Sequence, residues 1–127
     1  MPIVIDGALP AYKILSGEKI FVMDKTRAVS QDIRPIEIAV LNLMPTKEET
    51  ETQFMRLLSN SPLQVNVTLL STESYHSTHT AEGYLGKFYK SFRDVEKKHF
   101  DGMIVTGAPV EQMEFSSVAY WDELKRI

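Results

Sequence analysis

Two turns in this sequence hold the groups best placed to do chemistry. The first, residues 42–47, follows an apolar segment and ends at Lys47, where a helix is expected to begin. A helix N-terminus presents free backbone N–H groups that favour an anion, whereas a lysine there opposes the helix dipole. Lys47 therefore indicates a place for an anionic ligand or a developing oxyanion. A solvated surface lysine is the alternative interpretation.

The second turn, residues 106–109, follows the short apolar segment 103–105. Its glycine, Gly107, permits either a close approach of the backbone or a positive φ angle, although ordinary turn chemistry explains it equally well. Glu111 and Glu114 lie just beyond the turn. Paired carboxylates can act as acid and base, but two loop glutamates are also typical of a solvated surface.

Other reactive side chains form no recognisable site. His76 and His79 lie three residues apart in a segment rich in serine and threonine, but no third metal ligand stands nearby. His99 is isolated, so no metal site is predicted. The chain contains no cysteine, and no nucleophile elbow, dinucleotide-binding glycine pattern or P-loop occurs.

Composition restricts the class of protein. The 127 residues are 43% hydrophobic and 24% charged, with 14 basic against 17 acidic side chains, as in an ordinary soluble domain. The chain lacks the excess of basic residues that would indicate nucleic-acid binding. Its apolar runs are shorter than a membrane span. The first residues lack the features of a secretory signal, so a cytoplasmic location is expected.

The elements that must position the two turns alternate in type. Residues 1–35 are expected to be an irregular N-terminal arm with an extended piece at 19–23. Strands are expected at 36–43, 63–70 and 103–105, a loop at 71–80, and helices after Thr46, from about 80 to 92, and from about 117 onward. Alternating strands and helices predict an α/β parallel sheet, whose ligands bind at the carboxyl ends of the strands.

The first helix is expected to begin with a capping box. Thr46 and Glu49 have the required spacing. In the helix that follows, Phe54, Leu57 and Leu58 form the expected inward face, while Glu48, Glu51 and Thr52 are expected to face outward. The last helical pattern runs to residue 127 with no stop signal. It predicts the first half of a larger α/β domain, with a small complete domain as the alternative.

Several segments together resemble one known family. They are IRP at 33–35, LNLMP at 41–45, ETE at 49–51, QF at 53–54, RLLSNSPLQV at 56–65, FDG at 100–102, VTGAP at 105–109 and AYW at 119–121. The chain is similar over essentially its whole length to the bacterial homoserine O-acyltransferases of methionine biosynthesis, the MetA type.

The resemblance implies a fold and a reaction. The fold is a flavodoxin-like sheet, as in class I glutamine amidotransferases. Residues 36–127 would be the N-terminal half of the acyltransferase domain with this fold. The reaction moves an acyl group from acyl-CoA to L-homoserine through a cysteine thioester, with a histidine and a glutamate completing the triad. These three residues belong to the later part of the family sequence, so no catalytic residue is assigned here and the chain alone is expected to be inactive. The missing C-terminal half is its expected partner, a homodimer is expected for the family, and no cofactor is expected beyond acetyl-CoA as co-substrate.

Two family roles carry over to residues of this chain. Glu111 resembles the acyl-donor selector, where glutamate accompanies acetyl-CoA and glycine accompanies succinyl-CoA, because a glutamate would repel the succinyl carboxylate. Lys47 matches a family lysine near the active site. The expected substrate or oxyanion region comprises Thr46, Lys47, Thr106, Gly107 and Ala108. The alternatives are a homoserine O-succinyltransferase, a non-catalytic binding module, and a flavodoxin-like protein that binds another anion.

Overall fold

The core of the protein is a parallel β-sheet. A computed structural model describes residues 3–24, 34–73, 83–110 and 112–127. In these ranges six strands form one sheet: β1 (Ile3–Val4), β2 (Val22–Met23), β3 (Ile36–Leu41), β4 (Val65–Leu70), β5 (Tyr89–Lys90) and β6 (Gly102–Val105). Their order is β2-β1-β4-β3-β6, and β5 pairs with β4 further along the same edge as β1. All pairs are parallel, which confirms the predicted α/β class.

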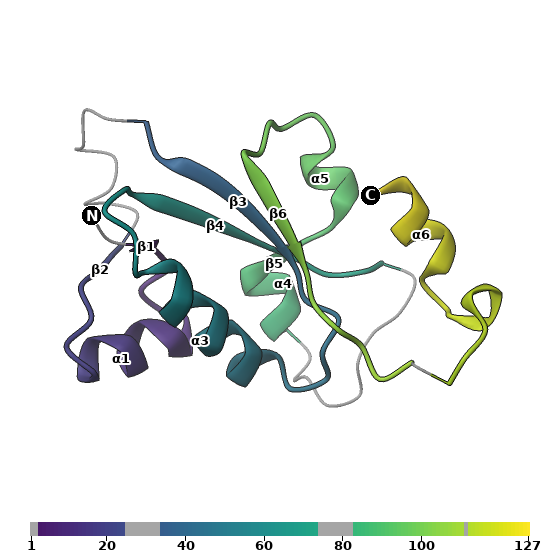
Figure 1. Cartoon of the computed structure of the whole chain (residues 1–127), viewed down its shortest axis with the longest axis horizontal. Helices are drawn as coiled ribbons and strands as arrows, with labels where there is room; N and C mark the ends of the chain where they lie inside the picture. Colours follow the sequence, from purple (N-terminus) through teal and green to yellow (C-terminus); the bar gives the residue numbers. More distant parts are fainter. Residues whose placement is uncertain (1–2, 25–33, 74–82, 111) are drawn as a thin grey trace.

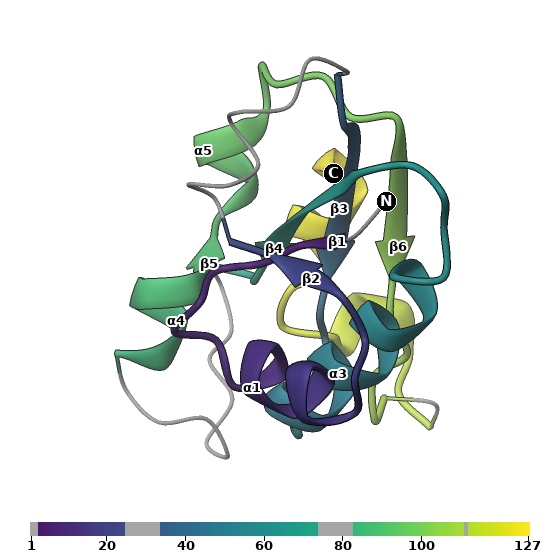
Figure 2. The same cartoon turned by 90° about the vertical axis from the view of Figure 1, so that its left-hand side faces the viewer.

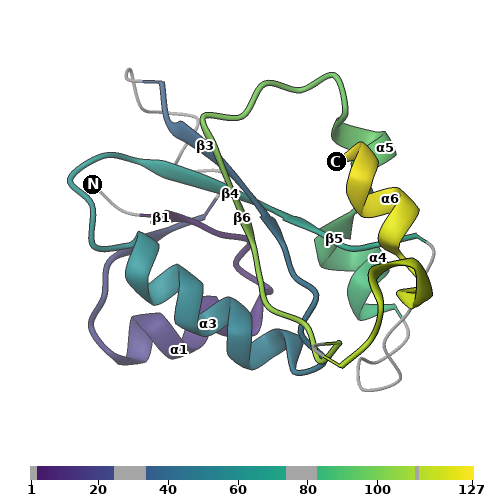
Figure 3. The same ribbon diagram turned by 45° about the vertical axis from the view of Figure 1, so that its right-hand side comes forward.

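Helices cover both faces of this sheet. They are α1 (Pro10–Gly17), α3 (Lys47–Leu58), α4 (Tyr84–Phe88), α5 (Phe92–Val95), the 3-10 helix η1 (Phe115–Ser117) and α6 (Trp121–Arg126). Figure 1 and the turned views in Figure 2 and Figure 3 place α1 and α3 on one side of the strands and α5 and α6 on the other. Among the helices of the described ranges, none is both long enough and apolar enough to cross a membrane.

Strand alternation divides the core into two layers. Because neighbouring side chains of a strand point to opposite faces, Val40 packs with Leu15 and Met55 under α1 and α3. Its neighbours Ala39 and Leu41 instead pack against α5 and α6 on the other face. The central strand β3 is therefore covered on both sides, which agrees with its largely apolar sequence.

The region expected to be an irregular arm is largely regular in its described part, so that expectation is wrong for β1 and α1, while β2 lies within the extended piece expected at 19–23. Strands β1 and β2 join the sheet edge, and Ile3 and Leu15 are fully buried. Pro10 occupies the first turn of α1. A proline is favoured at that position because the first backbone N–H groups of a helix have no intrahelical partner. It therefore starts the helix instead of interrupting an ordered segment.

The buried face of α3 is only partly the predicted one: Leu58 packs against the core and Glu48 is exposed, but Glu51 and Thr52, expected to face outward, are buried. Lys47, Glu51 and Met55 follow one another at intervals of four residues and are 7%, 2% and 2% exposed. Leu57, expected to face inward, is 72% exposed. The pattern of large apolar residues was misleading because this helix turns two ionisable side chains inward.

One prediction about a helix start and one about the continuity of a helix are also wrong. Thr46 makes no side-chain capping bond, and its backbone (φ −89°, ψ 74°) departs from the extended geometry that such a cap needs. A capping box forms instead at α5, between Ser91 and Asp94. The start of the expected helix over 80–92 lies outside the described residues, and its described part is divided into α4, β5 and α5 by the pairing of β5 with β4.

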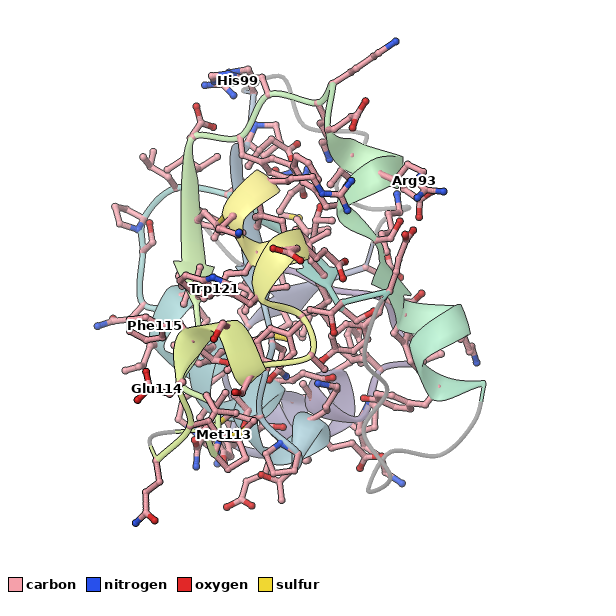
Figure 4. All side chains as sticks on the ribbon, turned by 90° about the vertical axis from the view of Figure 1, so that its right-hand side faces the viewer. Arg93, His99, Met113, Glu114, Phe115 and Trp121 are labelled. Atoms are coloured by element: carbon pink, nitrogen blue, oxygen red, sulfur yellow. The ribbon has the colours of Figure 1, made fainter. Side chains whose placement is uncertain are left out.

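Strand β6 ends the sheet with a free edge among the described strands. Its residues Met103 and Val105 belong to the apolar segment 103–105 but are 41% and 50% exposed. Nearby, the rings of Phe115 and Trp121 stack with centroids 4.9 Å apart, and Phe115 is itself exposed (Figure 4). Strand β6 and the neighbouring η1 therefore present exposed apolar side chains.

Candidate functional site

The two predicted turns meet at the carboxyl ends of β3 and β6. Thr106, which follows β6, donates its backbone N–H to the Leu41 carbonyl oxygen at 3.1 Å. Its hydroxyl accepts a hydrogen bond from the Leu43 backbone N–H at 2.8 Å and donates to the Gly107 carbonyl at 3.0 Å. Thr106 thus joins the two turns, and it is buried. The structure therefore forms the predicted edge where a parallel sheet binds ligands.

Lys47 lies beneath the first turn and is buried. Its ammonium group donates to the carbonyl oxygens of Asn42 at 2.6 Å and Met44 at 3.1 Å, and it lies 5.8 Å from the centre of the Tyr89 ring. Burial lowers the pKa of Lys47, while the nearby Glu51 acts in the opposite direction. The contacts show a lysine that holds the turn closed from inside.

A buried carboxyl group stands next to Lys47 on the same helix. Glu51 accepts hydrogen bonds from the hydroxyl groups of Tyr84, at 2.6 Å, and of Tyr89. The Tyr89 hydroxyl in turn accepts from the Asn42 side-chain amide at 2.9 Å. We call Glu51, Tyr84, Tyr89 and Asn42 the Glu51 cluster.

Burial controls the acid–base properties of this cluster. Desolvation raises the pKa of Glu51, although hydrogen bonds from Tyr84 and Tyr89 act to lower it. Desolvation and the neighbouring Glu51 raise the pKa values of both tyrosines well above the usual range, so both hydroxyl groups keep their protons. The tyrosines therefore serve as hydrogen-bond donors to Glu51 and not as bases.

The remaining predicted residues take different positions. Thr46 and Gly107 are exposed, and Ala108 is half-buried beside them. Gly107 does not have the positive φ that was one alternative, and a Cβ added there would meet nothing within 4 Å. The open space leaves a close approach to the backbone as its predicted role.

Several candidates fall outside the site or outside the described part. Glu111, His76 and His79 are not among the described residues. Glu114 is exposed, and His99 is an exposed side chain with its Nε2 3.5 Å from an Asp101 oxygen. In the portion of the chain that the structure describes, no three histidine, aspartate or glutamate side chains gather as metal ligands.

A cavity of about 450 Å³ opens elsewhere, where the edge of β4 lies between the end of β1 and the start of β5. Its lining includes Glu37, Lys87 and Lys98. The predicted site residues that the structure describes are absent from this lining, although Tyr89 of the Glu51 cluster, which contacts Asn42, belongs to it.

Sequence reasoning missed Asn42, Glu51 and Tyr89. The sequence predicts an outward-facing Glu51 because charged side chains are rarely buried. The signal that could have found it is the four-residue spacing from Lys47 to Glu51 to Met55, which places all three on one helix face. The tyrosine contact depends on residues 33 and 38 positions away from Glu51, and no local pattern encodes such a pairing.

Comparison with known proteins gives the family. The profile of the homoserine O-succinyltransferase family matches residues 2–127. The chain belongs to this family. Among its curated relatives are proteins named homoserine O-acetyltransferase from Lachnoclostridium phytofermentans (58% identical), Bacillus cereus strain AH187 (59%) and Bacillus anthracis strain CDC 684 (59%).

The alignment with each of these three relatives covers the whole chain. The alignments extend over 127 residues, which is 100% of this chain and 42% of each relative. The chain therefore spans less than half the length of the curated relatives it matches.

Proposed function

We propose that the complete protein is a homoserine O-acetyltransferase that moves an acetyl group from acetyl-CoA to the hydroxyl group of L-homoserine in methionine biosynthesis. This chain would be its N-terminal segment. The observation that carries the proposal is that the whole length of the chain aligns, at 58–59% identity, with relatives of that name. A cytoplasmic location, and acetyl-CoA as the co-substrate with no separate cofactor, belong to the same proposal.

The proposed reaction divides the work between two parts of the protein. A cysteine thiolate attacks the thioester carbonyl of acetyl-CoA, the CoA thiolate leaves, and an enzyme thioester forms. The homoserine hydroxyl then attacks that thioester, gives up its proton to a base and releases the thiol. Because this chain contains no cysteine, the nucleophile would come from the part of the protein outside it.

The contribution proposed for this chain is the backbone of the second turn, residues 106–108, at the carboxyl ends of the strands. The backbone from Thr106 to Ala108 is accessible at Gly107, where a reacting group can approach closely. Preorganised N–H groups stabilise an oxyanion best when they do not have to move during the reaction. The bonds from Thr106 to Leu41, Leu43 and Gly107 provide such rigidity.

Glu111 is the proposed selector of the acyl donor. A carboxylate at that position would repel the terminal carboxylate of succinyl-CoA, while the short, neutral acetyl group avoids this repulsion. The second candidate function is homoserine O-succinyltransferase, which the description of the matching family profile favours. The two differ only in the donor.

The rest of the protein is proposed to cover the free edge of β6. The connection from β5 through α5 crosses the sheet to β6, on the same face as α6 (Figure 3). Crossovers between parallel strands keep one handedness, so a strand that follows α6 would continue in the same direction, beyond β6. It would lie beside the exposed side chains Met103 and Val105.

This arrangement also addresses the alternative of a binding module. A free strand edge with exposed apolar side chains favours association with another chain, so the isolated segment would be a non-catalytic partner for whatever completes the sheet. The C-terminal half of the same enzyme is the proposed occupant. A homodimer of the complete protein is a further proposal, which sedimentation of that protein tests.

The complete protein should be assayed with L-homoserine and either acetyl-CoA or succinyl-CoA. We expect O-acetylhomoserine, with a kcat/KM for acetyl-CoA well above that for succinyl-CoA. A preference for succinyl-CoA would support the second candidate instead. No product from either donor would contradict the proposed function altogether. The 127-residue chain alone should give no turnover.

A further inference from the structure

The carboxyl group of Glu51 is almost completely enclosed by protein. Glu51 is 2% exposed. It lies on α3 and points toward α4 and β5, where Tyr84 and Tyr89 donate to its two oxygens. Its neighbour Lys47 directs its ammonium group to backbone carbonyls and forms no ion pair with it. A buried carboxyl group without a direct cationic partner is costly to the fold. Its contacts therefore need an explanation beyond stability.

The hydrogen bonds of this cluster have a fixed direction. A carboxylate only accepts hydrogen bonds, so the single hydroxyl hydrogen of Tyr89 goes to Glu51. The Tyr89 oxygen is then left to accept, and it does so from the Asn42 side-chain amide at 2.9 Å. The other end of that side chain, Oδ1, accepts from the Met44 backbone N–H at 3.1 Å. Glu51 thus favours the observed orientation of the Asn42 amide, which is also supported by the Met44 N–H and by a longer bond from the amide to the Lys47 carbonyl at 3.4 Å.

Asn42 connects this buried chain of bonds to the first turn. Its side chain holds the Met44 backbone, and its own carbonyl oxygen accepts from the Lys47 ammonium at 2.6 Å. The next residue, Leu43, is bonded to Thr106 of the second turn. Asn42 therefore connects the buried Glu51 cluster, through hydrogen bonds, to the edge of the sheet where the two turns meet.

We infer that Glu51, acting through Tyr89 and Asn42, is a positioning residue that holds the turn 42–47 in place for the reaction. This inference rests on the proposed acetyl transfer for its kinetic consequence. Glu51 touches no reacting group. Its effect passes through two hydrogen bonds, and a displacement of the turn by about 1 Å is enough to reduce turnover strongly.

The two tyrosines offer a matched test. Both donate to Glu51, but only Tyr89 also contacts Asn42. In the complete protein, Tyr89→Phe is expected to lower kcat for homoserine acetylation by roughly tenfold or more, with a smaller change in KM for acetyl-CoA. Tyr84→Phe removes the other Glu51 bond and is expected to leave kcat within about twofold of the wild type.

Thermal unfolding of both variants separates positioning from general support of the fold. If the cluster only stabilises the protein, the two variants will lose kcat in proportion to their loss of folded protein, and the folded fraction will turn over normally. Equal kcat values for Tyr89→Phe and Tyr84→Phe, once corrected for folded fraction, would overturn the inference.

Amide hydrogen exchange gives a readout that does not depend on activity. Tyr89→Phe should speed exchange at the Met44 amide and its neighbours in the turn, whereas Tyr84→Phe should leave the turn unchanged. If the wild-type protein acetylates no homoserine, the proposed function fails, but the exchange experiment still tests the positioning. Unchanged exchange in Tyr89→Phe would contradict the inference even for an active enzyme.

Discussion

Arg34 and Asp101 form a two-point ion pair across the amino-terminal ends of β3 and β6. The two guanidinium nitrogens of Arg34 lie 3.0 and 3.2 Å from the two Asp101 carboxylate oxygens. The same carboxylate accepts from the Glu37 backbone N–H at 2.8 Å. The segment that precedes β3 is thereby fixed to the turn that precedes β6, opposite the edge that carries the candidate site.

Asp101 should make the stability of the protein sensitive to acid. The Arg34 guanidinium, together with the Glu37 N–H, lowers the pKa of Asp101 from its ordinary value of 3.8 to about 2. A carboxyl with a depressed folded-state pKa stabilises the fold above its unfolded pKa, and this contribution is lost as the pH falls from about 4 to about 2. Denaturant unfolding of Asp101→Asn should show lower stability than wild type at pH 7, with the difference shrinking below pH 4.

The control is Asp122→Asn, which removes an exposed pair with Lys125 within one helix. Such pairs contribute little, so Asp122→Asn should behave like the wild type at pH 7. A difference between Asp101→Asn and wild type that stays constant from pH 7 to pH 2 would contradict the ion-pair explanation.

Glu51 should show the opposite dependence on pH. Burial raises the pKa of Glu51 above 4.5, so the folded protein binds a proton more readily than the unfolded chain. The associated stability is fully present below pH 4.5 and is lost as the pH rises through the folded-state pKa. Relative to wild type, Glu51→Gln should therefore become more favourable as the pH rises from 4 to 8. A stability difference that does not change over this range would show that burial does not penalise the carboxylate.

Met55 and Leu57 provide a paired test of the observed face of α3. Met55 is 2% exposed in the core under α1 and α3, whereas Leu57 is 72% exposed. Met55→Ala should cost about 2–5 kcal/mol of unfolding free energy because it leaves a cavity. Leu57→Ala should change it by less than about 0.5 kcal/mol. Chemical unfolding of the complete protein measures both, and the reverse order would support the helix orientation that the sequence suggested.

Glu111→Gly tests the proposed donor selection. Removing the carboxylate should raise kcat/KM for succinyl-CoA by at least about tenfold, because like-charge juxtaposition costs several kcal/mol. The kcat/KM for acetyl-CoA should change much less. Steady-state kinetics with both donors decides the point, and Glu111→Gln separates charge from volume. An unchanged donor ratio in Glu111→Gly would rule out the electrostatic explanation.

Val105 tests the proposed covering of β6. It is half exposed in this chain, but the complete protein should bury it beside an added strand. Val105→Asp should then destabilise the complete protein severely, because an unpaired charge would be buried. Leu57→Asp, at a more exposed position, serves as the comparison. Equal stabilities for the two variants would indicate that the β6 side chains stay exposed.

The sheet could be predicted further than the site could. The apolar run at 36–43 and the alternating run at 63–70 identified β3 and β4 to within two residues at each end, because apolar pattern and strand period are local properties. Strands β1, β2 and β5 have only two residues each. Such short strands leave no periodic pattern and exist only because a partner lies beside them.

The two turns were found because turn residues follow apolar strands, and parallel sheets place such turns at one edge. The bond between Leu43 and Thr106 agrees with that reasoning. The Glu51 cluster could not be found in this way. A helix whose inward face carries Lys47 and Glu51 contradicts the local preference for burying apolar residues, and the distant hydroxyl groups of Tyr84 and Tyr89, which donate to Glu51, make it acceptable.

The placement of β1 between β2 and β4 has a consequence for the order of folding during synthesis. Ile3 pairs with Val22 early in the chain but also with Val65, which leaves the ribosome much later. Strand β1 is made before both of its neighbours, so one of its edges stays unpaired until β4 has emerged. A nascent chain stalled before Val65 should bind chaperones through β1, and β1 should be released once β4 lies beside it.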